Sequence, residues 1–130
     1  MSGEVVTFGE VLLRLSPPGT ERLFQSPMLR TWWGGAEANV AAGLAHLGTA
    51  ARHVTVLPVG PIGDAAVRAL RADGVNTGDI VRSGTRMGLY YLEPGADLRP
   101  LQVTYDRAHS AFAQLNPSAF DWETLLRGAR

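Results

Sequence analysis

Hydrophobic and polar positions fall into a regular alternation over the first half of the chain. Short apolar runs at residues 5–8 and 52–59 are typical of strands buried in a sheet. Residues 36–47 and 64–73 are rich in alanine and other good helix formers, and a glycine follows each segment. Two helices are therefore predicted, the second with Asp64 as its N-cap. Strands alternating with helices predict right-handed β-α-β crossovers and an α/β fold around a parallel sheet.

A different pattern surrounds these elements. Residues 11–33 hold extended runs on either side of a Pro-Pro-Gly turn, and residues 85–107 hold two strand-like runs separated by a loop with Pro-Gly. Their mixture of polar and aromatic residues suits a sheet with one face in water. We therefore expect these two segments to form a small antiparallel accessory sheet inserted in the core. Helical character returns after Ser110, and residues 124–130 are predicted to be a helix.

Composition restricts the chemistry. The 130 residues carry twelve basic and twelve acidic side chains, and this neutral balance gives no support for a nucleic-acid partner. The chain has no cysteine, which excludes thiol catalysis and disulfides. All of its basic residues are arginine, so Schiff-base chemistry and a P-loop lysine are also excluded.

The sequence also argues against membrane and metal sites. No apolar run approaches the ~20 residues needed to span a bilayer, and the first residues lack the layout of a signal peptide. A cytoplasmic protein without a membrane partner is therefore expected. His46, His53 and His109 do not stand at metal-ligand spacing with other ligands, so packing or surface roles are expected for them and no metal site is predicted.

Two glycines open the first predicted helix, in the run Gly-Gly-Ala-Glu-Ala-Asn at residues 34–39. Without a Cβ, Gly34 and Gly35 let a ligand approach the backbone closely, and the N–H groups of a helix start favour oxygen-rich or anionic ligands. Asn39 in the first turn offers both a donor and an acceptor. A plain glycine turn between a strand and a helix explains the spacing equally simply. The run is neither a P-loop nor a dinucleotide-binding fingerprint.

A second candidate follows the last predicted strand, in the run Tyr-Asp-Arg-Ala-His-Ser-Ala at residues 105–111. Arg107 presents a planar fork suited to a carboxylate or a phosphate. Tyr105 and Arg107 should lie on one face, because strand side chains repeat every two residues. Tyr90 on the preceding strand would support the same polar pocket or simply pack. An exposed edge strand with a solvated arginine is the alternative interpretation.

The order of these motifs resembles the N-terminal part of the PfkB, or ribokinase-like, carbohydrate kinases. The resemblance covers nearly all of residues 4–130, and within the family the run at 105–111 is similar to the 2-keto-3-deoxygluconate kinases. Each motif alone is weak, whereas the ordered set is specific. The set comprises Gly9-Glu10 after the first strand, Gly-Gly-Ala-Glu-Ala-Asn at 34–39, Leu-Ala-His-Leu-Gly at 44–48, Gly-Asp at 63–64 and the run at 105–111.

The resemblance implies an incomplete Rossmann-like ribokinase fold with a small β-sheet lid over the sugar site. It implies ATP-dependent phosphorylation of 2-keto-3-deoxygluconate to the 6-phospho product, with ATP and Mg²⁺ as cofactors and a sugar acid as the small-molecule partner. Lid sheets would also be able to pair between subunits of a homo-oligomer. The substrate-binding residues carried over from the family are Gly34, Gly35, Asn39, Tyr90, Tyr105 and Arg107.

One part of the family pattern is missing. The Gly-Ala-Gly-Asp segment, with the catalytic aspartate and the anion hole, lies further downstream in the family and has no counterpart up to Arg130. Residues 1–130 are therefore expected to be the substrate-facing part of a kinase, without a catalytic residue, and inactive alone. Two alternatives stay open: another PfkB sugar kinase of the ribokinase or fructokinase type, or a non-catalytic sugar-binding or oligomerisation module.

Overall fold

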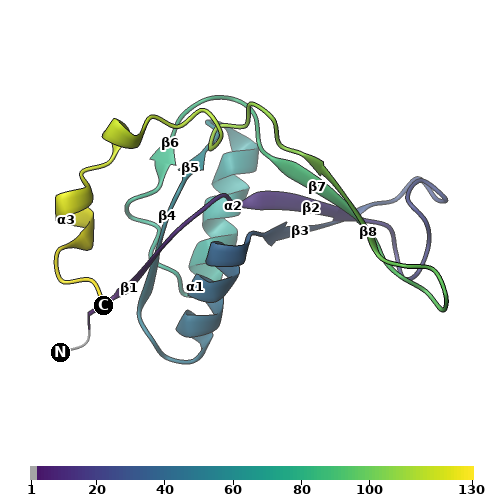
Figure 1. The fold of residues 1–130 in the computed structure, drawn as a ribbon, viewed down its shortest axis with the longest axis horizontal. Helices are drawn as coiled ribbons and strands as arrows, with labels where there is room; N and C mark the ends of the chain where they lie inside the picture. Colours follow the sequence, from purple (N-terminus) through teal and green to yellow (C-terminus); the bar gives the residue numbers. More distant parts are fainter. Residues whose placement is uncertain (1–2) are drawn as a thin grey trace.

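The computed structural model describes residues 3–130 and divides into an α/β core and a sheet that projects from it (Figure 1). This arrangement confirms the predicted fold class. In chain order the elements are β1 (Val5–Phe8), β2 (Leu12–Ser16), β3 (Arg30–Gly34), α1 (Ala36–His46), β4 (Ala51–Val54), β5 (Val56–Leu57), α2 (Pro61–Ala72), β6 (Val81–Arg82), β7 (Leu89–Glu93), β8 (Gln102–Asp106), the 3-10 turn η1 (Pro117–Ala119) and α3 (Trp122–Leu126).

The core strands are parallel, as the sequence predicts. β1 pairs with β4 in a register that places Val5 opposite Ala51, and β5 pairs with β6 with Val56 opposite Val81. The single strand expected over residues 52–59 is thus divided between β4 and β5, because the two halves hydrogen-bond to different neighbours.

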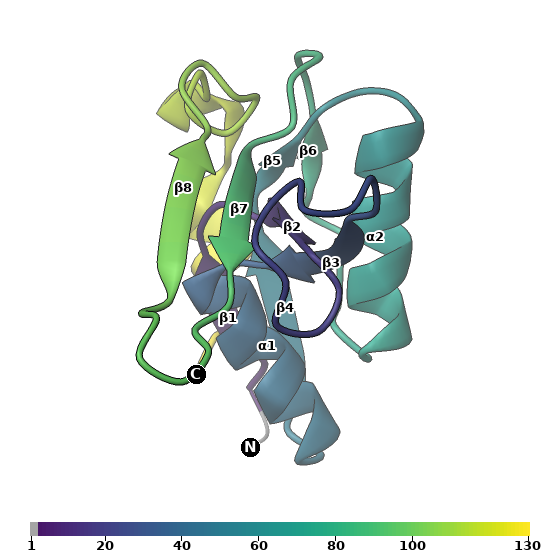
Figure 2. The ribbon, with the colours of Figure 1, turned by 90° about the vertical axis from the view of Figure 1, so that its right-hand side faces the viewer.

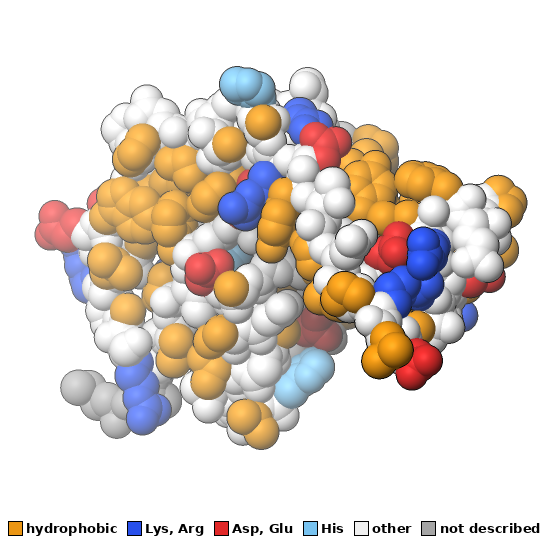
Figure 3. Space-filling view, turned by 45° about the vertical axis from the view of Figure 1, so that its right-hand side comes forward, with side chains coloured by type: hydrophobic (Ala, Val, Ile, Leu, Met, Phe, Trp, Pro, Cys, Tyr) orange, Lys and Arg blue, Asp and Glu red, His pale blue; other side chains and the backbone are white. Residues whose placement is uncertain are grey.

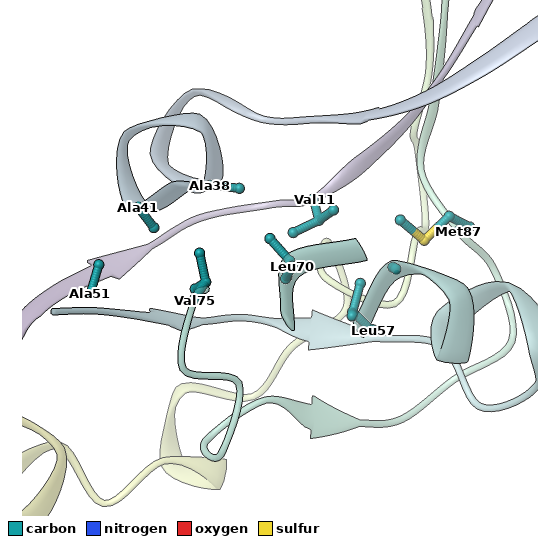
Figure 4. Packing of buried hydrophobic residues seen from close by; sticks show 9 residues of the cluster. Val11, Ala38, Ala41, Ala51, Leu57, Leu70, Val75 and Met87 are labelled. Carbon is teal, nitrogen blue, oxygen red and sulfur yellow. The ribbon is translucent and has the colours of Figure 1, made fainter. Parts of the chain in front are cut away.

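The strand period of two sends alternate side chains to opposite faces of the core sheet. Ala51 and Leu57 face α1 and α2 and join the larger apolar cluster, part of which Figure 4 shows around Ala41 and Leu70. Val54 and Val56 pack on the other face against the C-terminal segment, where Phe120 is buried. Both faces of these short strands are covered, so that His53 and Thr55 are buried along with the apolar residues beside them.

The projecting sheet, here called the lid, has the strand order β3-β2-β7-β8. Figure 2 shows these strands side by side above the start of α1. Its strands come from the two segments predicted to form an accessory sheet. One feature differs from the prediction: β2 and β7 are parallel, with Leu13 opposite Leu89, so the sheet is mixed rather than antiparallel. The cause is topological, because both strands leave the core in the same direction.

The start of α2 corrects the sequence prediction. The helix begins at Pro61 with Gly60 as its N-cap, not after Asp64. Gly60 has a φ of 112°, which favours glycine, and proline is well suited to the first helical position. Asp64 instead lies in the first turn, where its carboxylate accepts a hydrogen bond from Arg82 at 2.7 Å.

The last helix is also shifted from its predicted range of 124–130. α3 starts at Trp122 because Asp121 caps it, accepting a hydrogen bond from the Thr124 amide at 3.1 Å. The hydrogen bond from the Thr124 hydroxyl, and to a smaller extent the one from its amide, lowers the pKa of Asp121. The chain leaves the helical conformation at Arg127, whose ψ is 117°, and Gly128 follows with a φ of 75°. Within residues 3–130 no helix combines the length and the apolar character required to cross a membrane.

Candidate functional site

A cavity of about 740 Å³ lies between the lid and the beginning of α1. Gly35 and Asn39 line it from the core, and Tyr90, Tyr105 and Arg107 line it from the lid side. The structure therefore brings five of the six predicted site residues together, although they are separated by up to about half of the sequence.

The core wall depends on two glycines. Gly35 has a φ of 143°, and a Cβ at this position would lie 2.3 Å from the carbonyl oxygen of Glu10, so only glycine fits without displacement. Gly35 also accepts the first hydrogen bond of α1, from the Asn39 amide at 2.8 Å. Gly34 does not line the cavity. A Cβ there would lie 2.7 Å from the hydroxyl oxygen of Tyr90, so the absence of a side chain makes room for that tyrosine.

The lid wall is built from a cross-strand aromatic pair. Tyr90 on β7 lies opposite Tyr105 on β8, and their ring centroids are 5.9 Å apart. The Arg107 guanidinium carbon lies 4.9 Å from the centroid of the Tyr105 ring, a cation–π distance. This contact confirms that Tyr105 and Arg107 share a face, and it holds a half-exposed guanidinium beside the cavity.

Two carboxylates also line the cavity, and the sequence analysis did not select them. Glu10 follows β1, and its side chain is only 10% exposed. Glu37 lies in the first turn of α1 and reaches the backbone of Gly9, where a Cβ would be 2.2 Å from its carboxylate oxygen. One signal could have found Glu10: ligand-binding residues gather at the carboxyl ends of parallel strands, and Gly9-Glu10 directly follows the first strand.

His53 lies on β4, beneath the part of the core that carries Gly9 and Glu37. The side chain is fully buried, and its Nδ1 atom is 2.8 Å from the Thr7 hydroxyl oxygen. Burial lowers the pKa of His53, while the Gly9 backbone and the Glu37 charge act in the opposite direction. The ring is therefore neutral at neutral pH, which agrees with the packing role expected from the sequence.

Several side chains that line the cavity are chemically suited to the hydroxyl and carboxylate groups of a ligand. Asn39 and the tyrosine hydroxyls both donate and accept hydrogen bonds, and the arginine fork matches the geometry of a carboxylate. Residues 3–130 contain no group of three or more His, Cys, Asp or Glu side chains placed to hold a metal ion.

The family model described as pfkB family carbohydrate kinase matches residues 2–128. The 2-dehydro-3-deoxygalactonokinase of Haloferax volcanii is 40% identical over 117 residues, which cover 90% of this chain and 37% of that protein. The chain thus spans less than two fifths of the length of this relative.

Solved structures give the same relationship. The 2-dehydro-3-deoxygluconokinase of Thermotoga maritima superposes with a TM-score of 0.96 and 55% identity, over 98% of this chain and 39% of that one. The fructokinase of Xylella fastidiosa with bound ATP superposes with a TM-score of 0.77 and 26% identity, over 95% of this chain and 39% of that one. In each case the similarity extends across both the core and the lid.

Proposed function

The chain belongs to the pfkB family of carbohydrate kinases, and from this premise we propose that it supplies the sugar-binding part of an ATP-dependent kinase for 2-keto-3-deoxygluconate. The γ-phosphoryl group of ATP is transferred to the sugar's terminal hydroxyl. A new P–O bond forms, the bond to ADP breaks, and the hydroxyl proton passes to the family's catalytic aspartate, which has no counterpart in these 130 residues.

The observation that carries the proposal is the position of Arg107. Its guanidinium stands beside a cavity whose other polar groups suit hydroxyls, and its side chain is 54% exposed, so an incoming carboxylate can reach it. A neutral sugar has no group that requires such a fork, whereas the carboxylate of a sugar acid matches it with two parallel hydrogen bonds.

The remaining cavity residues have roles in this proposal that follow from their positions. Gly35 and Asn39 contact the sugar from the core, and Tyr90 and Tyr105 contact it from the lid. Gly34 acts through Tyr90 by leaving space for its ring. A sugar held between two walls is shielded from water, which limits the wasteful hydrolysis of ATP.

ATP and Mg²⁺ are the cofactors that the family implies. Residues 3–130 contain no group of three or more acidic, histidine or cysteine side chains placed around a metal position, and we assign no Mg²⁺ ligand to them. We propose the cytoplasm as the location of the protein, as expected from the sequence.

The test uses a chimera in which this chain replaces the matching part of the Thermotoga maritima relative, whose fold it matches closely. ADP release should be far faster with 2-keto-3-deoxygluconate than with ribose or fructose. Equal rates would refute the sugar-acid assignment and favour a ribokinase or fructokinase type. The 4-epimer, 2-keto-3-deoxygalactonate, must be assayed in parallel, since the Haloferax volcanii relative is named for that sugar.

A non-catalytic sugar-binding module is the second candidate, and titration distinguishes it. Calorimetry of the 130-residue chain with the sugar acid measures binding without catalysis. If the chain binds the sugar acid but the chimera does not release ADP, the binding module is favoured. If the chain binds the sugar acid and the chimera releases ADP rapidly, the kinase is supported.

We also propose that the lid pairs between subunits of a homo-oligomer. Several large apolar side chains on the lid strands and their connecting loop are exposed, including Trp32 at 41% and Leu101 at 56%. Figure 3 shows hydrophobic side chains at the surface of the lid, on the right of the view. Light scattering should give at least a dimer for the chimera, and Trp32→Glu should shift it to the monomer.

A further inference from the structure

Glu10 occupies the junction between the core and the lid. Its backbone carbonyl lies against Gly35, and one of its carboxylate oxygens would lie 3.2 Å from a Cβ at Gly88, where the chain enters β7. Glu10 itself stands between β1 and β2, and Arg107 directly follows β8. The four places where the chain passes between core and lid therefore converge on this residue.

One carboxylate oxygen of Glu10 is fixed by Ser110. The Ser110 hydroxyl donates to Oε2 of Glu10 at 2.8 Å and itself accepts a hydrogen bond from the Ala113 amide at 3.1 Å. Ser110 is 1% exposed, so this arrangement is shielded from water. A carboxylate that is largely removed from water needs further compensation for its charge.

Arg107 is the cation that faces the other carboxylate oxygen. Its Nη1 atom lies 3.9 Å from Oε1 of Glu10, too far for a hydrogen bond and close enough for charge attraction. The Tyr105 ring supports the same guanidinium from another side. Arginine has five N–H groups, so one nitrogen can face Glu10 while the rest of the fork remains available to a ligand.

We propose that Glu10 is a positioning residue, which holds the Arg107 guanidinium beside the cavity in the orientation that receives the carboxylate of a sugar acid. This inference rests on the proposed function, because it assigns to Arg107 the recognition of that carboxylate. Glu10 does not touch the ligand in this role and acts through Arg107 alone.

Charge repulsion alone and the positioning role predict opposite changes in sugar-acid affinity when Glu10 is removed, so the direction of the change tests the proposal. A negative charge near the cavity repels an anionic sugar, so the removal of Glu10 would tighten binding if charge alone mattered. If Glu10 orients Arg107, its removal weakens binding. The Arg107→Gln background is the control, since no guanidinium remains there for Glu10 to orient and only the charge of Glu10 and its contact with Ser110 are left.

The experiment measures KM and kcat of the chimera for 2-keto-3-deoxygluconate. Glu10→Gln should raise KM about fivefold, the upper range for a partly exposed ion pair, with little change in kcat. In an Arg107→Gln background, Glu10→Gln should have no further effect. An unchanged or lower KM in the Glu10→Gln variant, or an equal increase in the Arg107→Gln background, would overturn the proposal.

A second readout is independent of the sugar. NMR of the 130-residue chain labelled with ¹⁵N-arginine observes the Nε–H groups of the arginine side chains. The signal that disappears in Arg107→Gln is assigned to Arg107. In Glu10→Gln this signal should show a lower order parameter than in the wild type. If wild-type protein ignores sugar acids but this loss of order occurs, the proposed function fails and the positioning role stands. If Glu10→Gln does not fold by circular dichroism, Ser110→Ala takes its place, because it frees the carboxylate and should also raise KM.

Discussion

Replacement of Gly35 by alanine tests the geometry on which the core wall of the cavity depends. Gly35 has a φ of 143°, a region that side-chain-bearing residues rarely occupy. The new methyl group would lie 2.3 Å from the Glu10 carbonyl oxygen, and this neighbour is backbone that cannot rotate away. Gly35→Ala must therefore push the β1–β2 connection away from the start of α1.

The magnitude follows from two costs. A non-glycine residue in this backbone region costs about 1–3 kcal/mol. Non-bonded heavy atoms prefer a separation of roughly 3.5 Å, so the walls must move by about 1 Å, and such overpacking costs about 1–3 kcal/mol. Alanine recovers about 0.4–1 kcal/mol by restricting the unfolded chain. The net loss of stability is about 3 kcal/mol, and the midpoint of thermal unfolding should fall by roughly 10 °C.

Circular dichroism melts of the 130-residue chain measure this change. The matched control is Gly43→Ala, in the middle of α1, where a Cβ would meet nothing within 4 Å. Because alanine is the better helix former, this control should raise stability by about 0.5–1 kcal/mol. A Gly35→Ala variant that melts within roughly 2 °C of the wild type would refute the reasoning about the close approach to Glu10.

The other predictions concern ligand binding, pH and the start of α2. Arg107→Lys keeps the charge but loses the planar fork, so calorimetry should show about tenfold weaker binding of the sugar acid with unchanged binding of fructose. The lowered pKa of buried His53 makes the unfolded state take up a proton first, so stability should fall as pH decreases below about 6.5. The melting temperature of His53→Gln should vary less over that range, with His109→Gln as the surface control, and equal slopes in the wild type and His53→Gln would contradict this. Gly63→Ala would place a Cβ 2.0 Å from the Pro58 carbonyl oxygen, so urea unfolding should show a loss of about 2–3 kcal/mol; an unchanged midpoint would contradict it.

Much of the fold could be predicted because its signals are local. The alanine-rich segment ended by Gly48 and the apolar run of β1 follow from propensity and period alone, and the structure confirms both. The start of α2 was predicted wrongly because two local signals compete there. Asp64 is a good N-cap by type, but Gly60 and Pro61 have the backbone conformations that begin a helix, so the N-cap lies four residues earlier.

The candidate site divides in the same way. Gly35 and Arg107 could be selected from the sequence because a glycine pair before a helix and an arginine after a strand have recognisable chemistry. Glu10 was not selected, although its position directly after the first strand is a signal for a ligand-binding residue, because the sequence does not show which side chains it contacts. Its position is fixed by Ser110, one hundred positions away, whose hydroxyl donates a hydrogen bond of 2.8 Å to the Glu10 carboxylate.

The sequence by itself therefore determined the α/β class, the presence of a lid and the family, because these depend on residue type, period and motif order along the chain. Only the tertiary structure decided which residues share a cavity and how strand β2 pairs with β7, since these depend on contacts between distant segments. Packing also decided that Gly34 makes room for Tyr90 and does not line the cavity. The register of a strand determines which face each of its residues lies on, and the sequence does not give that register for β3.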